Sequence, residues 1–198
     1  SLSVSPASPI LEIGSARGDF LSIFHDERLV FGIEHSSVNV DFARRRGLYV
    51  IQGFPSQPIG EILPDEFTPG LIFVNNFLEH QPRPVDFVSN IITVMQQDTL
   101  LFISVPNLDR IIETSCLYEF VADHVCYFNV STLVNTLRVC GLEVVLSYKK
   151  NNDNDVVVVC RKQRTNLLVD AKNRMEQNIK PLREALAEFK RNQKKVVV

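Results

Sequence analysis

The chain of 198 residues has the length of one domain, with or without a short appendage. Apolar residues make up 45% of it and charged residues 22%, which excludes a disordered chain, a collagen-like repeat and a disulfide scaffold. The net charge of −2 is unevenly spread: residues 1–160 hold 10 basic and 19 acidic side chains, whereas residues 161–198 hold 11 and 4. The acidic main body argues against nucleic acid as a partner.

The sequence shows neither an apolar stretch long enough to span a membrane nor a secretory leader. Its four cysteines are widely spaced and form no C-x-x-C pair, which disfavours both zinc ligation and a disulfide framework. We therefore expect a cytoplasmic protein that does not bind membranes and has no metal site.

Short apolar runs alternate with helical stretches along the first 160 residues. In chain order they predict a strand over 10–13, a helix over 18–25, a strand over 29–33, a helix over 36–46, strands over 48–51 and 71–74, a helix over 84–95, a strand over 100–105, a helix over 131–140, and strands over 143–146 and 155–160. The strands are continuous Val, Ile, Leu and Phe runs, which is typical of parallel strands covered on both faces. The polar turn at 151–154 predicts a hairpin that adds an antiparallel strand at one edge. The expected fold class is α/β, with a doubly wound, mostly parallel seven-stranded sheet.

The last segment has a helical pattern of its own. Its apolar positions recur every three or four residues, at Leu168, Ala171, Met175, Ile179, Leu182, Leu186 and Phe189. This spacing places them on one stripe of a helix, which Pro181 should kink or split. We therefore expect a ligand-binding domain over 1–163 and an amphipathic helical extension over 164–198, leading to a missing C-terminal region. The helix over 165–195 is a candidate surface for a flanking domain or for a homo-oligomer.

Ligands of such sheets bind where the strands end. Gly14 and Gly18 follow the first strand, and glycine allows the backbone to approach a ligand or to turn sharply. Glu34 ends the second strand, 20 residues after Gly14, where a carboxylate can accept both hydroxyls of a ribose. The loop lacks the Gly-Lys-Ser/Thr of a phosphate-binding P-loop and the spacing of a dinucleotide G-x-G-x-x-G. A tight strand-to-helix turn without any ligand explains the two glycines equally well.

Further motifs favour the ligand site. The loop Glu12-x-Gly14-x-x-x-Gly18, the acid at position 34 and the stretch 75–80 (NNFLEH) occur in order, and this set resembles class I S-adenosylmethionine (SAM)-dependent methyltransferases. Within that family, the stretches 12–18, 31–36, 104–107 and 119–128 look like those of a subgroup that contains sugar C-methyltransferases. The resemblance covers roughly residues 10–148. It departs from the subgroup's pattern at Ala16, Arg17, His35 and Phe54.

The resemblance implies SAM as the cofactor and methyl transfer to a small, sugar-like molecule, a nucleotide-linked sugar or polysaccharide precursor. It implies a cofactor site made of residues from the ends of the strands: Glu12, Gly14, Ser15, Gly18, Glu34, His35, Gly53, Phe54 and Asn75. A hydroxyl or enolisable carbon acceptor needs a base near neutral pH, for which histidine is suited. The candidate catalytic residues are His80, His124 and Tyr127, with Glu119 and Asp123 orienting them.

Other readings of these residues remain open. His80 could cap the helix that follows the fourth strand, and His124 and Tyr127 could hold a loop to the sheet. The departures at Ala16, Arg17 and Phe54 motivate an alternative, a catalytically inactive methyltransferase-like interaction domain. A nicotinamide-binding domain is disfavoured by the spacing of the glycines.

Overall fold

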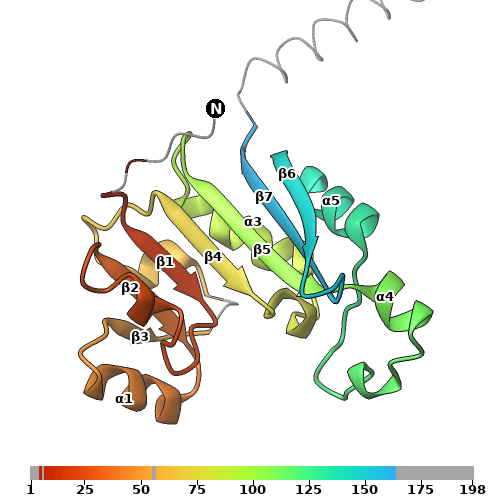
Figure 1. Cartoon of the computed structure of the whole chain (residues 1–198). Helices are drawn as coiled ribbons and strands as arrows, with labels where there is room; N and C mark the ends of the chain where they lie inside the picture. The colour runs from red at the N-terminus through yellow and green to blue at the C-terminus, as the bar shows by residue number, and fades with distance from the viewer. Residues whose placement is uncertain (1–4, 6, 55–56, 164–198) are drawn as a thin grey trace, which may run out of the picture. The chain divides into compact units, whose positions relative to one another are not determined.

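The computed structural model describes residues 5, 7–54 and 57–163. One sheet contains the seven strands of this part of the chain: β1 (Ile10–Ile13), β2 (Val30–Glu34), β3 (Val50–Gln52), β4 (Leu71–Asn75), β5 (Leu100–Pro106), β6 (Leu142–Lys150) and β7 (Asp155–Lys162). The strand order is β3-β2-β1-β4-β5-β7-β6, in which the first five strands are parallel and β7 is antiparallel to both of its neighbours (Figure 1). The predicted seven-stranded, mostly parallel α/β sheet is confirmed.

The helices cover the sheet on both faces. They are α1 (Ser37–Arg45), α2 (Ile59–Ile62), α3 (Pro84–Val94), α4 (Leu108–Glu113) and α5 (Val130–Val139), with short 3-10 helices η1 (Leu21–Ile23), η2 (Leu78–His80) and η3 (Leu117–Glu119). Helices α2, α3 and α5 share one core cluster with the sheet, and α3 packs against α5 (Figure 1). Helix α1 and η1 contribute to a second cluster. Within β1, Ile10 belongs to the second cluster and Leu11 to the first, so the strand is covered on both sides, as its continuous apolar sequence indicates.

Local signals fix where the main helices begin. The Ser36 side chain accepts the N–H of Asn39 and caps α1, and Pro84 occupies the first turn of α3. Helix α5 begins with a capping box, in which Asn129 and Thr132 exchange side-chain and backbone hydrogen bonds. These capping contacts explain why the predicted starts of the three helices lie within one residue of the observed ones.

Two details of the prediction are wrong. The helix expected over 18–25 is only the short η1: the N–H of Ile23 bonds to Phe20, three residues back, and the Ser22 hydroxyl donates to the Asp19 carbonyl that an α-helix would use. The hairpin over β6 and β7 exists, but its antiparallel strand does not lie at the edge. Strand β7 lies between β5 and β6, because its Val156–Cys160 run is fully buried, whereas β6 carries exposed residues and forms the edge.

Helices α2 and α4 were not predicted; each has at most six residues. The helical extension predicted over 164–198 lies outside the described residues. Within those residues, no helix is both long and apolar enough to cross a membrane.

Candidate active site

Glu34 joins the end of β2 to the loop that follows β1. Its carboxylate is buried, with a 4% exposed side chain, and accepts the N–H of Ala16 at 2.9 Å and the N–H of Ser36 at 2.8 Å. The Nδ1 of the half-exposed His35 lies 3.2 Å from the same carboxylate. The acid predicted to bind a ribose thus points toward the glycine loop and not into bulk water.

Glu12 is a second buried acid at this loop. Its Oε1 accepts the amide of Asn75 at 3.3 Å, while its Oε2 is buried without a hydrogen-bond partner. Burial raises the pKa of Glu12 to about 8, and the bond from Asn75 only partly offsets this effect. The hydroxyl of Ser15 is likewise buried and unpartnered. Native proteins rarely leave such atoms unpaired, so both atoms are candidate contacts for a polar ligand.

The residue next to Gly14 is Phe77, whose ring lies against the glycine. We had expected a bound ligand to require the glycine at this position. Its φ of +77° is strained for other residues, and a Cβ at this position would lie 2.5 Å from Cδ2 of Phe77. Phe77 follows β4, and its ring centroid is 6.3 Å from that of His80. Phe77 therefore lies near both the glycine loop and His80.

The predicted adenine side lies at the end of β3. The N–H of Gly53 donates to the Glu34 carbonyl at 3.1 Å, which attaches this loop to β2. The Phe54 side chain is 56% exposed, and its ring lies 6.1 Å from that of His35. An exposed aromatic ring near the acid predicted to bind a ribose has the geometry to stack on a base.

Arg17, which departs from the family pattern, does not obstruct the loop. Its guanidinium lies over the Phe42 ring of α1, 5.1 Å from the centroid. Gly18 is fixed by packing as well, since a Cβ there would collide with Leu48. The structure therefore brings the residues predicted for the cofactor to one rim of the sheet, the ends of β1, β2, β3 and β4.

The three predicted catalytic residues also meet. The rings of His80 and His124 are 4.8 Å apart, and Tyr127 lies 6.2 Å from His124. His80 Nδ1 lies 2.9 Å from the carbonyl oxygen of Asp123. This contact links η2 to the 120–127 segment. His80 lies within η2 and Arg83 is the N-cap of α3, so the alternative that His80 caps the helix after β4 is wrong.

Sequence reasoning missed a small polar hollow of about 140 Å³ beside this cluster. Its lining comes from the residue after β4, the end of β5, α4 and the residues after it, η3, the hairpin turn and the start of β7. The lining residues are Asn76, Pro106, Ile111, Thr114, Cys116, Tyr118, Glu119, Asn154 and Asp155. Among them, only Glu119 was predicted to act in the site. Asp155 reaches the hollow because β7 pairs with β5, where Pro106 opposes Asp155, and the edge placement predicted for the antiparallel strand hid this neighbour.

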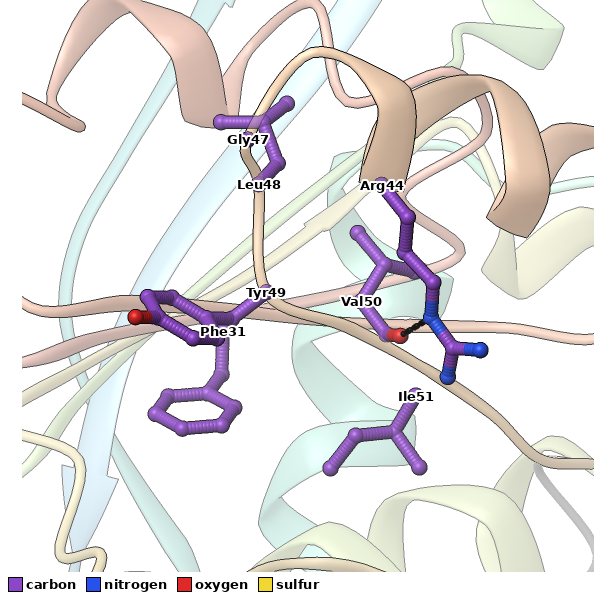
Figure 2. Close-up of a pocket in the computed structure, with 7 residues that line it drawn as sticks. All are labelled: Phe31, Arg44, Gly47, Leu48, Tyr49, Val50 and Ile51. Carbon is purple, nitrogen blue, oxygen red and sulfur yellow. Dashed lines mark hydrogen bonds between the residues drawn. The ribbon is translucent and has the colours of Figure 1, made fainter.

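A wider hollow of about 410 Å³ lies elsewhere, at the start of the edge strand β3 (Figure 2). Figure 2 shows Phe31 and Tyr49 on one side of it and Arg44 on the other, with Arg44 Nε donating to the Val50 carbonyl at 2.8 Å. The arginine occupies an edge carbonyl that an added strand would need, and no acid lines this hollow. Its contacts are those of a protected sheet edge.

Comparison with solved structures gives the same class of fold. A chain of the complex between the Haloferax volcanii Trm112 methyltransferase activator and a methyltransferase matches with a TM-score of 0.67 at 13% identity, over 81% of this chain and 84% of that one. A SAM dependent methyltransferase from Archaeoglobus fulgidus matches with a TM-score of 0.63 at 16% identity, over 79% of this chain and 86% of that one. The mitomycin 7-O-methyltransferase MmcR matches with a TM-score of 0.65 at 20% identity, over 81% of this chain and 50% of that one. The fold is that of the SAM-dependent methyltransferases.

A family model described as a methyltransferase domain matches residues 5–147. The match spans well over half of the chain, and the chain therefore belongs to this methyltransferase family. No curated protein matches the sequence. The predicted family is confirmed, while the sugar C-methyltransferase subgroup stays a prediction.

Proposed function

We propose that this chain transfers a methyl group from SAM to a small molecule, with a nucleotide-linked sugar or polysaccharide precursor as the acceptor class. The observation that carries the proposal is the pair of buried acids at the glycine loop. Glu12 keeps one oxygen unpartnered there, and Glu34 faces the Ala16 amide. SAM carries an ammonium and a sulfonium cation and a ribose diol, so two carboxylates and the free Ser15 hydroxyl fit its chemistry. The fold and the family support the same cofactor.

SAM supplies the electrophilic methyl group, and the protein's task is to position the acceptor and handle its proton. The close approach of His80, His124 and Tyr127 supports a role for them beside the acceptor, where they would take a proton from its hydroxyl. The hollow lined by Asn76, Glu119 and Asp155 offers the hydrogen-bonding groups that a sugar ring needs. Its 140 Å³ is below the ~300–1,000 Å³ of typical small-molecule sites, so it suits part of an acceptor. Four free cysteines support a reducing compartment such as the cytoplasm.

Calorimetric titration of the full chain tests the proposal. We expect SAM and S-adenosylhomocysteine to bind with a stoichiometry of one and NAD to give no heat. If the folded protein binds neither SAM nor S-adenosylhomocysteine at millimolar concentration, methyl transfer is contradicted. The alternative hypothesis, a catalytically inactive interaction domain, would then be favoured.

Binding of SAM should release a proton at pH 7. The pKa of Glu12 is raised to about 8 by burial, so this carboxyl is mostly protonated at pH 7 before the ligand arrives. A cation placed at Glu12 lowers its pKa below 7, and the proton leaves to the buffer. Binding heats measured in buffers of different ionisation enthalpy should therefore differ for the parent chain. They should converge for Glu12→Gln, which cannot ionise; equal buffer dependence in both chains would remove Glu12 from the cation's surroundings.

A further inference from the structure

Three side chains with metal-ligating atoms converge where η2 meets the 120–127 segment. One ligand atom each from Glu79, His80 and His124 lies within 4.8 Å of the other two. The backbone holds the two segments together, because the N–H groups of Val125 and Cys126 both donate to the Glu79 carbonyl at 3.0 Å. The juxtaposition is therefore fixed by main-chain bonds.

His80 is oriented as a metal ligand requires. Its Nδ1 lies 2.9 Å from the Asp123 carbonyl oxygen, which can only accept, so Nδ1 carries the proton. In the neutral imidazole the other nitrogen, Nε2, has a lone pair for a metal, and it lies 3.9 Å from Oε1 of Glu79. A histidine that donates its second N–H to a backbone carbonyl is the usual outer-shell arrangement around a bound metal.

The cluster also contains two polar atoms without partners. Oε2 of Glu79 and Nδ1 of His124 are buried and make no hydrogen bond. The Glu79 side chain is 3% exposed, so water does not solvate its carboxyl group. An ion between the three groups would satisfy the carboxylate and offer a partner to both imidazoles.

We propose that Glu79, His80 and His124 bind a divalent first-row transition-metal ion of the Zn²⁺ type. Two imidazoles and one carboxylate suit such ions better than Mg²⁺ or Ca²⁺, which prefer oxygen ligands. Metal–ligand bonds of about 2.0–2.2 Å require the ligand atoms to approach one another by roughly 1 Å. Three protein ligands would leave a fourth coordination position for water or another ligand.

The site revises one expectation and refines another. No metal was predicted, because only cysteine spacing had been considered, whereas these ligands come from sequence positions 79–80 and 124. Ion binding as such does not depend on the proposed function. Within it, His80 and His124 would bind the ion in place of taking the acceptor's proton. The ion would polarise the acceptor's oxygen and lower the pKa of its hydroxyl, so that the proton leaves to water, and Tyr127 remains free to contact the acceptor.

The test is titration of the metal-free full chain with Zn²⁺, followed by Co²⁺ as a spectroscopic probe. We expect one ion per chain and the visible absorption of Co²⁺ with nitrogen and oxygen ligands. Glu79→Gln and His124→Ala should each weaken binding by more than about tenfold. His25→Ala is the matched control, since His25 lies outside the cluster, and it should bind as the parent does.

Two results would overturn the site. One is absence of binding by a chain that retains its fold by circular dichroism. The other is binding that survives both ligand variants or shows a thiolate-to-cobalt band, because the ion then sits elsewhere or on a cysteine. Titration of the metal-free chain with SAM distinguishes the two proposals. If the chain binds Zn²⁺ but does not bind SAM, the methyltransferase function is contradicted and the metal site is not.

Discussion

Replacing Glu34 with alanine should weaken SAM binding by about ten- to a hundredfold, since hydrogen bonds to a charged group contribute ~1.5–3 kcal/mol each. The carboxylate positions the glycine loop through the Ala16 N–H and is expected to accept the ribose hydroxyls. The free energy of unfolding should fall as well, by about 1–3 kcal/mol, because the Ala16 and Ser36 amides lose their acceptor. Calorimetry gives the first quantity and urea denaturation the second.

The control for this change is Glu27→Ala, which removes the same charge from an exposed carboxylate close in sequence to β2. It should leave SAM affinity unchanged, which excludes a general electrostatic effect of the acidic body. If Glu34→Ala lost stability yet kept its affinity for SAM, the carboxylate would be a structural brace of the loop and the ribose would bind elsewhere.

Gly14→Ala should be among the most damaging single substitutions in the glycine loop. The φ of +77° costs an alanine about 1–2 kcal/mol, and the added Cβ would collide with the ring of Phe77 at a further cost of ~1–3 kcal/mol. We expect the free energy of unfolding to drop by about 2–5 kcal/mol, and Tm to fall by roughly 5–15 °C. Differential scanning calorimetry measures the shift.

A double-mutant cycle separates the two causes. Phe77→Ala removes the ring, so it should cost less in the Gly14→Ala background than in the parent, with a coupling of about 0.5–3 kcal/mol. The part due to the backbone conformation should remain. Strictly additive losses in the free energy of unfolding would show that the Phe77 ring does not collide with a Cβ at position 14.

The positions of the strands could be predicted because their sequences need no distant partner to be recognised. The Val156–Val159 run is apolar at every position, which signals a strand with both faces covered. The sequence of β6 differs, because the stretch 147–150 reads Ser-Tyr-Lys-Lys, a polar sequence typical of an edge strand. This difference between the two strands could have placed β7 inside the sheet. The prediction failed there because a hairpin leaves either of its strands free to pair with β5.

Contacts across long sequence separations set the limit for the site. The rim that holds Glu12 and Glu34 followed from strand ends alone. By contrast, nothing in the sequence pairs Gly14 with Phe77, 63 residues later, or puts Asp155 beside Asn76. The unpartnered atoms of Glu79 and His124 likewise emerge only once η2 and the 120–127 segment are in contact.

The place of β7 has a consequence for how the chain is made. Strand β7, the last strand in sequence, lies inside the sheet and pairs with β5. One edge of β5 therefore stays unpaired until β7, up to Cys160 opposite Leu101, has left the ribosome. The edge strand β6, although translated earlier, has no docking partner before that moment. The nascent sheet therefore has an unpaired strand edge at β5 until β7 is synthesised. A chain that stalls shortly before Asp155 would expose this edge, which can pair with other chains and aggregate.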